Sequence, residues 1–164
     1  MFEGFSVRSK QIVFTARFKA GERGANTIET DDLLVAVILE DQGLLEGAFS
    51  SLIEREGRLV EEAEPHIPFF SARVAGHLLS DLKRSLWQSQ PVPLSTDLPI
   101  SSSLEQVFDS AKALQARFRN SHIEPLHLLA AIQKENSAEG AKLLERSGIT
   151  QEQVLSALGA TGKQ

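Results

Sequence analysis

Apolar residues recur at steps of three and four along most of this chain. The clearest stripe consists of Leu104, Val107, Phe108, Ala111, Leu114 and Phe118. At ~100° per residue, such spacing places the side chains on one face of an α-helix. No segment shows the alternation of β-branched and polar residues that is typical of a strand. The pattern therefore predicts an all-α fold.

The helical pattern occurs twice. Sliding the chain over itself by 95 residues places residues 5–38 over residues 100–133, and eight of these 34 pairs are identical, where chance would give about two. The identical pairs are Ser6/Ser101, Gln11/Gln106, Ala16/Ala111, Ile28/Ile123, Glu29/Glu124, Leu33/Leu128, Leu34/Leu129 and Ala36/Ala131. In the first copy, the core face of the first helix is expected at Ile12, Val13, Ala16 and Ala20. The sequence thus predicts a duplicated helical unit.

Capping residues predict where the helices begin. Either Ser101 or Ser102 can cap the first helix of the second copy. Thr30 is placed to cap the second helix of the first copy, whereas Pro125 takes the first helical position of its counterpart. The remaining helices are expected at residues 44–56 (stopped by Gly57), 138–147 and 150–158, the last opened by a capping box of Thr150 and Gln153.

A proline-rich connector separates the two copies. Residues 65–99 hold five of the six prolines around one helical stretch, which predicts loop, helix, loop. The apolar row of that stretch faces either the pair of repeats or a bound partner; it consists of Val74, Leu78, Leu82 and Leu86. We therefore divide the single domain 1–164 into repeat one (2–64), a connector with an extra helix (65–99), repeat two (100–159) and a tail (160–164).

Composition and charge narrow the possible functions. The chain carries 17 Lys and Arg against 22 acids, a net charge of −5, so it lacks the basic footprint that nucleic-acid binding needs. The absence of cysteine excludes a disulfide scaffold, a thiol nucleophile and a thiolate zinc site. No apolar run reaches membrane-spanning length, and the first residues lack the regions of a signal peptide. We therefore expect a cytoplasmic protein.

The sequence carries no motif of catalytic chemistry. A phosphate-binding glycine-rich loop, a dinucleotide fingerprint and a nucleophile elbow are all missing. His122 and His127 flank Glu124, but their spacing does not place the two imidazoles on one helix face. We therefore predict no catalytic residue, cofactor or metal site. The alternative is a small helical enzyme or ligand-binding protein with a pocket near the connector, for which the candidate residues are Glu64, His66 and His77.

The two copies share a recognisable signature. The first copy reads FSVRSKQIV at residues 5–13 and GANTIETDDLL at residues 24–34, and the second reads IEPLHLL at residues 123–129. These segments resemble the Clp repeat, which opens the amino-terminal domain of the Clp family of ring-forming protein unfoldases. The resemblance covers roughly residues 2–64 and 100–159, and it implies a pseudo-twofold pair of four-helix repeats.

The resemblance implies a domain that performs no chemistry of its own. In the family it docks substrate proteins and adaptors for an ATP-driven unfoldase. Some members hold phosphorylated arginine with a polar residue that begins the first helix and an acid that begins the second. These positions are Ser6 and Asp31 in the first copy and Ser101 and Leu126 in the second, where leucine cannot make the charged contact. The alternative is that Ser6 and Asp31 only cap helices.

A second candidate surface lies on the first helix. Phe14 and Phe18 are four residues apart, roughly opposite the core face, where the family has small or charged residues. Two aromatic rings are a large apolar surface. Either the helix of the connector covers them, or they dock a protein or a second copy of the chain. The expected partners are protein substrates, adaptors or a Clp-type AAA+ ATPase, and the chain itself is expected to act as a stand-alone adaptor or modulator or as the leading domain of a longer chain.

Overall fold

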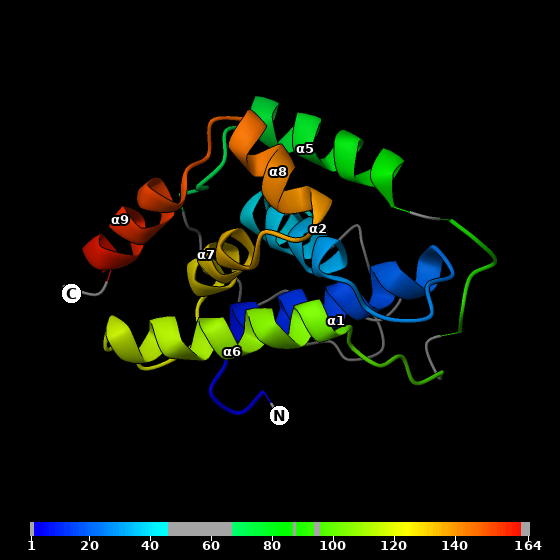
Figure 1. Cartoon of the computed structure of the whole chain (residues 1–164), viewed down its shortest axis with the longest axis horizontal. Helices are drawn as coiled ribbons and strands as arrows, with labels where there is room; N and C mark the ends of the chain where they lie inside the picture. The colour runs from blue at the N-terminus through cyan, green and yellow to red at the C-terminus, as the bar shows by residue number, and fades with distance from the viewer. Residues whose placement is uncertain (1, 46–66, 87, 94–95, 162–164) are drawn as a thin grey trace.

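The described part of the protein is all helical. The computed structural model describes residues 2–45, 67–86, 88–93 and 96–161. Within these ranges there are seven helices and no strand, so the predicted fold class is confirmed. The helices are α1 (Val7–Glu22), α2 (Thr30–Asp41), α5 (Ala72–Ser85), α6 (Ser102–Arg117), α7 (Pro125–Glu135), α8 (Glu139–Arg146) and α9 (Gln151–Thr161) (Figure 1). Nearly all of the helix expected at residues 44–56 lies outside the described residues, as does Gly57.

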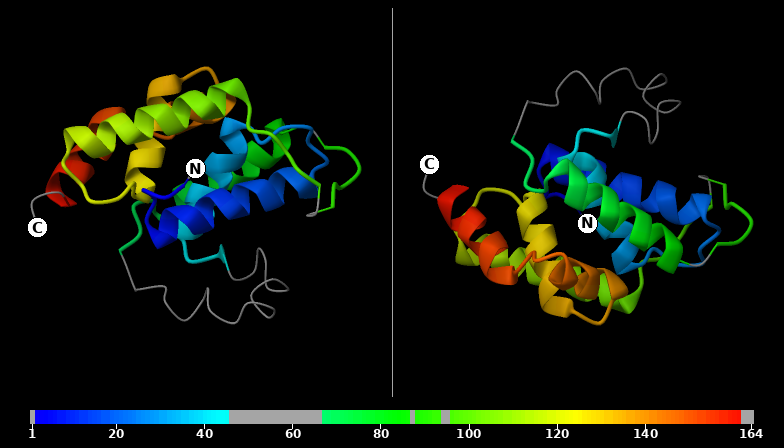
Figure 2. Two further views of the ribbon diagram at one scale, coloured as in Figure 1. Left: turned by 90° about the horizontal axis from the view of Figure 1, so that it is seen from below. Right: turned by 90° about the horizontal axis from the view of Figure 1, so that it is seen from above.

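Helices α2 and α7, the second helices of the two copies, form the centre of the molecule. They contact each other and lie between the longer helices α1 and α6 (Figure 2). Helix α1 packs on α2 as α6 packs on α7. The apolar stripes predicted from the sequence meet in this core, whose largest fully buried side chains are Ile12, Leu33, Leu34, Ile38, Leu78, Leu82, Leu104, Ile123, Leu128, Leu129, Ile132 and Leu144. Within the described ranges, none of the helices is both long and apolar enough to span a lipid bilayer.

Four backbone hydrogen bonds reveal pseudo-twofold symmetry at the junction of the two copies. They join Ser6 N–H to Ile123 O (3.1 Å), Ser101 N–H to Ile28 O (3.0 Å), Ile123 N–H to Gly4 O (2.9 Å) and Ile28 N–H to Pro99 O (2.9 Å). Each donor and acceptor of one bond has its counterpart 95 residues away in another bond. Such a reciprocal contact is what a twofold axis produces between two identical units. The predicted duplication is therefore confirmed in space.

The long first helix of each copy ends in the same left-handed turn. Gly24 follows α1 with φ 76°, and Arg119 follows α6 at the equivalent position with φ 55°. In each case the next N–H reaches back to the carbonyl five residues earlier, at 2.9 Å in the first copy and 3.1 Å in the second. A Cβ on Gly24 would lie 2.8 Å from the carbonyl carbon of Ser89 and still closer to Gln90 O. The turn after α1 therefore requires glycine, because the connector passes next to Gly24, whereas the equivalent turn after α6 accepts Arg119.

The connector is held against the end of α1 by backbone hydrogen bonds. Ser89 N–H donates to Arg23 O at 2.7 Å, and Val92 N–H donates to Gly21 O at 2.8 Å. The guanidinium of Arg17 donates to the carbonyl of Pro93 at 3.0 Å. Replacing Gly24 would therefore disturb both the turn and the path of the connector.

We expect Gly24→Ala to destabilise the protein by about 2–3 kcal/mol, since it adds a contact with backbone to the strain of a positive φ. Urea unfolding measures the change. Gly43→Ala is the matched control, because Gly43 also has a positive φ (70°) but a Cβ added there would meet nothing within 4 Å; strain alone costs it about 1 kcal/mol. Equal losses for the two variants would contradict the role given to the connector.

The second helix of the first copy begins differently from the prediction. Glu29, not Thr30, is its N-cap, and Asp32 Oδ2 accepts the Glu29 N–H at 2.9 Å. The prediction of Thr30 as the cap is wrong by one residue, because Glu29 and Asp32 form a capping box that leaves Thr30 as the first helical residue. The other predicted starts are confirmed, with Ser101 rather than Ser102 capping α6, Pro125 opening α7, and Thr150 and Gln153 forming the capping box of α9.

The predicted loop, helix, loop of the connector is also confirmed. Leu78 and Leu82 of α5 are fully buried, and α5 packs against α2 and α8. Its apolar row therefore faces the repeats, which is the first of the two alternatives. The residue boundaries of the repeats and the connector stay predictions.

Candidate functional site

Ser6 is the N-cap of α1. Its Oγ accepts the N–H of Ser9 at 3.1 Å, and its hydroxyl donates to Ser9 Oγ at 3.1 Å. Ser101 plays the same part in the second copy, where it accepts the N–H of Leu104 at 3.1 Å. The serines are equivalent in structure as well as in sequence, and each satisfies a backbone donor in the first turn of its helix.

Asp31 joins the two repeats. Its carboxylate is buried, with 9% of the residue exposed, and Oδ1 accepts the N–H of Gly140 at 2.9 Å in the first turn of α8. Desolvation by burial raises the pKa of Asp31. A side chain on Gly140 would meet Asp31 Oδ1, and its Cβ would lie 2.6 Å from Leu34. Asp31 therefore serves the start of a helix in the other repeat rather than its own.

The structure does not link Ser6 to Asp31. Among the described residues, no hydrogen bond or ion pair joins the two side chains. Each side chain instead accepts a backbone N–H within the protein: Ser6 that of Ser9, and Asp31 that of Gly140. For Ser6, this is the capping role that was the alternative to ligand binding. A phosphoarginine site at Ser6 and Asp31 stays a prediction.

Phe14 and Phe18 lie on α1, away from its core face. Phe14 is 44% exposed and Phe18 is half-buried. Because α5 packs against α2 and α8, the expectation that the connector helix covers the pair is wrong for Phe14. A protein-docking role for the two phenylalanines stays a prediction.

A cleft of about 760 Å³ lies between the two repeats. Its walls come from the start of α1, the end of α2, residues 67–70, the loop before α7, α7 itself and α9. Its apolar lining includes Val37, Phe69, Phe70, Leu126, Leu129 and Leu158. Leu126 thus lines this cleft at the position where the Clp repeat carries an acid, and Ile67 stands 93% exposed among the lining residues.

Two ionisable groups at the end of α2 hold the cleft together. Glu40 binds Arg8 of α1 in a two-pronged ion pair, at 2.7 and 2.8 Å. Asp41 accepts the N–H groups of Phe69 and Phe70 at 2.8 and 3.0 Å. Both carboxylates therefore fix segments that are distant in sequence, and both oxygens of each are bonded.

A neutral histidine supports the opposite wall. His127 is fully buried, and its Nδ1 accepts the N–H of Glu124 at 2.8 Å. Nε2 must then carry the proton, which it donates to Asn120 Oδ1 at 2.9 Å. Burial lowers the pKa of His127 to about 4, so the ring is uncharged at neutral pH. It occupies the place that Asp32 has in the first copy.

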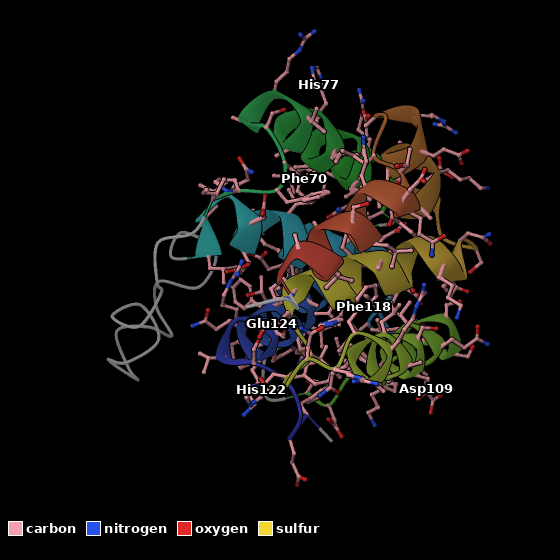
Figure 3. The ribbon with its side chains drawn as sticks, turned by 90° about the vertical axis from the view of Figure 1, so that its left-hand side faces the viewer. Phe70, His77, Asp109, Phe118, His122 and Glu124 are labelled. Carbon is pink, nitrogen blue, oxygen red and sulfur yellow. The ribbon has the colours of Figure 1, made fainter. Side chains whose placement is uncertain are left out.

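The residues of the predicted connector pocket are not brought together with this cleft. His77 lies on α5, at the end of the molecule remote from His122 and Glu124 (Figure 3). Glu64 and His66 lie outside the described residues. The connector contributes Ile67, Pro68, Phe69 and Phe70 instead.

Sequence reasoning missed Arg8, Asp41 and Asn120 as residues of the cleft. Arg8 and Glu40 are 32 residues apart, and Asp41 and Phe69 are 28 apart. Helical periodicity relates neighbours three or four residues apart, so it gives no signal for such pairs. The sequence did single out Leu126, which stands where the signature has an acid, and the group of His122, Glu124 and His127, all of which line the cleft.

A family model described as the Clp repeat (R) N-terminal domain matches residues 75–147 and 99–163. Together these matches cover more than half of the chain, from α5 onward. The predicted relationship to the Clp repeat is confirmed; of the segments that suggested it, residues 123–129 lie within the matched ranges, and residues 5–13 and 24–34 lie outside them.

Three solved structures share this fold and align with 98–100% of the chain. The N-terminal domain of the caseinolytic protease-associated chaperone ClpD from Arabidopsis thaliana is 20% identical, with a TM-score of 0.64 over 100% of this chain and 97% of that one. The Hsp104 N-terminal domain from Candida albicans is 15% identical, with a TM-score of 0.67 over 99% and 94%. A structure from a study of a malarial protein secretion system is 15% identical, with a TM-score of 0.72 over 98% and 95%.

Proposed function

We propose that this chain, which belongs to the family of Clp repeat (R) N-terminal domains, docks segments of other proteins in the cleft between its two repeats. The partners are substrates or adaptors of a Clp-type AAA+ ATPase, or the ATPase itself. The chain acts without catalysis, as a stand-alone adaptor or as the leading domain of a longer protein. Its cytoplasmic location and a homodimer stay predictions of the sequence.

One observation carries this proposal: apolar side chains form about half of the lining of the cleft, and the ionisable groups at its base are already bonded within the protein. Asp41 and His127 have their polar atoms paired, and Arg8 is paired with Glu40. Burying an apolar side chain on such a lining gains about 25 cal/mol per Å². Pairing the polar groups internally removes the cost of leaving them unsatisfied under a ligand.

The rim of the cleft adds polar groups that can orient a docked segment. Arg119 and His122 are exposed in the loop before α7. The left-handed backbone of Arg119 places it at the turn where the first copy has Gly24. Side chains at this rim can bond the backbone carbonyls of an extended peptide. The apolar lining then selects the side chains that the peptide buries.

The cleft also supports a second candidate function. Its volume of about 760 Å³ falls in the range of about 300–1,000 Å³ that is typical of small-molecule sites. The pocket lies beside the connector, as the alternative from the sequence expected, although its lining residues are different. A thermal-shift screen of metabolites, run beside protein binding, separates the two functions.

We expect Leu126→Glu to weaken binding of an unfolded protein at least fivefold, because the carboxylate must lose its water when an apolar segment docks. The probe is a reduced and carboxymethylated protein that stays unfolded, and fluorescence anisotropy gives its dissociation constant. The family's own acid at this position indicates that the fold accepts glutamate here. Leu44→Glu is the control, since Leu44 is 50% exposed and lies outside the cleft.

The proposal fails if the wild-type chain binds neither the unfolded probe nor a Clp-type ATPase. It also fails if Leu126→Glu and Leu44→Glu bind equally well. Stabilisation by a metabolite, without any protein binding, would support the second candidate instead.

A further inference from the structure

A second apolar groove lies on the other side of α2. It has a volume of about 470 Å³ and runs between α2 and α5, beside the end of α1. Its apolar lining consists of four half-buried side chains: Val35 and Leu39 from α2, Leu79 from α5, and Leu86, the residue that directly follows α5. Each wall of the groove thus presents two apolar side chains.

This groove is independent of the first cleft. Val35 lines the groove and Val37 lines the cleft, and two residues along a helix are about 200° apart. No lining residue is shared between the two. Both sites can therefore be occupied at once.

The charge beside the groove is opposite to the charge of the whole chain. The net charge of the protein is −5, and α2 carries four acids and no cation, yet the lining of the groove itself holds three cations (Lys19, Arg23 and Lys83) against two acids (Glu22 and Asp32). Lys19 of α1 and Lys83 of α5 line the groove. Lys83 is exposed, and Lys19 pairs with Glu22 at 3.1 Å on the surface.

The acid nearest the floor of the groove is already neutralised. Asp32 is fully buried and binds Arg23 through two hydrogen bonds, at 2.8 and 2.7 Å. The charges left to meet a ligand are therefore those of the lysines and the surface-paired Glu22. An apolar strip between lysines matches a helix with an apolar face and acidic edges.

We propose that this groove docks an amphipathic helix of a partner protein, with leucine-like anchors on its apolar face and glutamate or aspartate at its edges. The 14 residues of α5 span about 21 Å, so three to four turns of the partner lie along it. Anchors at i, i+3 or i+4, and i+7 meet the side chains of α2 and α5. The lysines contact the acidic edges and exclude basic helices.

Three synthetic peptides of 16 residues test the proposal on the full chain. The first has leucines at helical spacing and glutamates at the edges, the second replaces the glutamates with lysines, and the third scrambles the order of the first. We expect the first to bind, and the other two to bind at least tenfold more weakly in fluorescence anisotropy. Equal binding of the scrambled peptide would show a general attraction to acidic chains and would overturn the proposal.

Charge reversal in the protein gives the second arm of the test. The double variant Lys19→Glu/Lys83→Glu should weaken the acidic peptide at least tenfold and strengthen the lysine peptide. The matched control is Lys10→Glu/Arg73→Glu, which makes the same charge change on α1 and α5 outside the groove. The proposal is overturned if both double variants bind the acidic peptide alike.

The two docking sites are distinguished by a crossed experiment. Leu126→Glu should leave the acidic helical peptide unaffected, because Leu126 lines only the first cleft. If Leu126→Glu loses the peptide and Lys19→Glu/Lys83→Glu does not, the peptide binds in the cleft, and the proposal of a docking site in the groove is overturned. Analytical ultracentrifugation tests whether two copies of the chain associate through this face. If they do and the peptide separates them, the occupant of the groove is a second copy, and the proposal is overturned.

Discussion

Replacing Asp32 with alanine is expected to lower the free energy of unfolding by about 3–5 kcal/mol, the largest effect of any single change considered. Asp32 is fully buried, and Arg23, its partner across the turn, is only 8% exposed. The two form an ion pair at 2.7 Å, and the hydrogen bond to Asp32 raises the pKa of Arg23. Without the carboxylate, the guanidinium would be a buried charge with its strongest partner gone.

Two further losses accompany the removal of Asp32. The N–H of Glu29 loses the acceptor that closes the start of α2, and a lost cap of this kind costs about 1 kcal/mol. Arg23 also carries the carbonyl that accepts the N–H of Ser89 from the connector. A change at Asp32 is therefore expected to loosen the turn and the connector together.

Urea unfolding at neutral pH measures the loss for Asp32→Ala, and the control is Asp81→Ala. Asp81 pairs with Arg84 on the surface of α5, where an ion pair contributes about 0–1 kcal/mol. The double variant Arg23→Met/Asp32→Leu should recover part of the loss, because apolar residues of similar size leave no buried charge. A loss below about 1 kcal/mol for Asp32→Ala would show that the buried pair does not stabilise the fold.

Lowering the pH from 7.5 to 4.5 is expected to cost roughly 2–3 kcal/mol of stability through His127 alone. Burial lowers the pKa of His127 to about 4 in the folded protein, from an ordinary value of 6.5. Between these two values the unfolded chain binds a proton that the folded protein does not. The contribution of the neutral ring is therefore fully present above pH 6.5 and is lost as the pH falls towards 4.

The geometry explains why the folded protein resists this proton. Nδ1 already accepts the N–H of Glu124, so a protonated ring would direct a donor at a donor. Asp31 acts in the opposite direction at lower pH, because burial raises its pKa. The folded protein takes up that proton before the unfolded chain does, which offsets part of the loss due to His127.

The comparison of wild type with His127→Gln isolates the histidine. Glutamine can keep a hydrogen bond at this position but does not titrate, so its unfolding free energy should fall less between pH 7.5 and 4.5. His122→Gln is the control, because His122 is exposed, and it should follow the wild type. If His127→Gln shows the same pH dependence as the wild type, another group is responsible for the acid sensitivity.

Equivalent positions in the two repeats show which features of the site the sequence predicts and which it does not. Asp32 and His127 align in the duplication, and both accept the N–H of a glutamate at a helix start. Sequence alone placed both at the start of a helix. It did not show that one would pair with an arginine and the other with Asn120, because those partners come from the preceding turn and depend on how it folds back.

In the cleft between the repeats, too, the sequence predicted some of the lining residues and not others. Leu126 stood out in the sequence as a departure from an acid, whereas the lining by Phe69 and Phe70 did not. These phenylalanines reach the cleft because Asp41 binds their backbone N–H groups across 28 residues of chain or more. Cover by the connector helix was one of two alternatives for Phe14 and Phe18, and Phe14 stays 44% exposed whereas Phe18 is half-buried.

The sequence by itself determined the duplication, the all-α class and most helix starts. These features depend on periodicity, caps and prolines, which act between residues a few positions apart. Only the tertiary structure decided that Asp31 serves the other repeat, that α5 lies on α2 and α8, and that Gly24 must remain glycine where Arg119 is tolerated. The reason is that each of these outcomes depends on a neighbour brought close by folding, and no local spacing encodes which neighbour that will be.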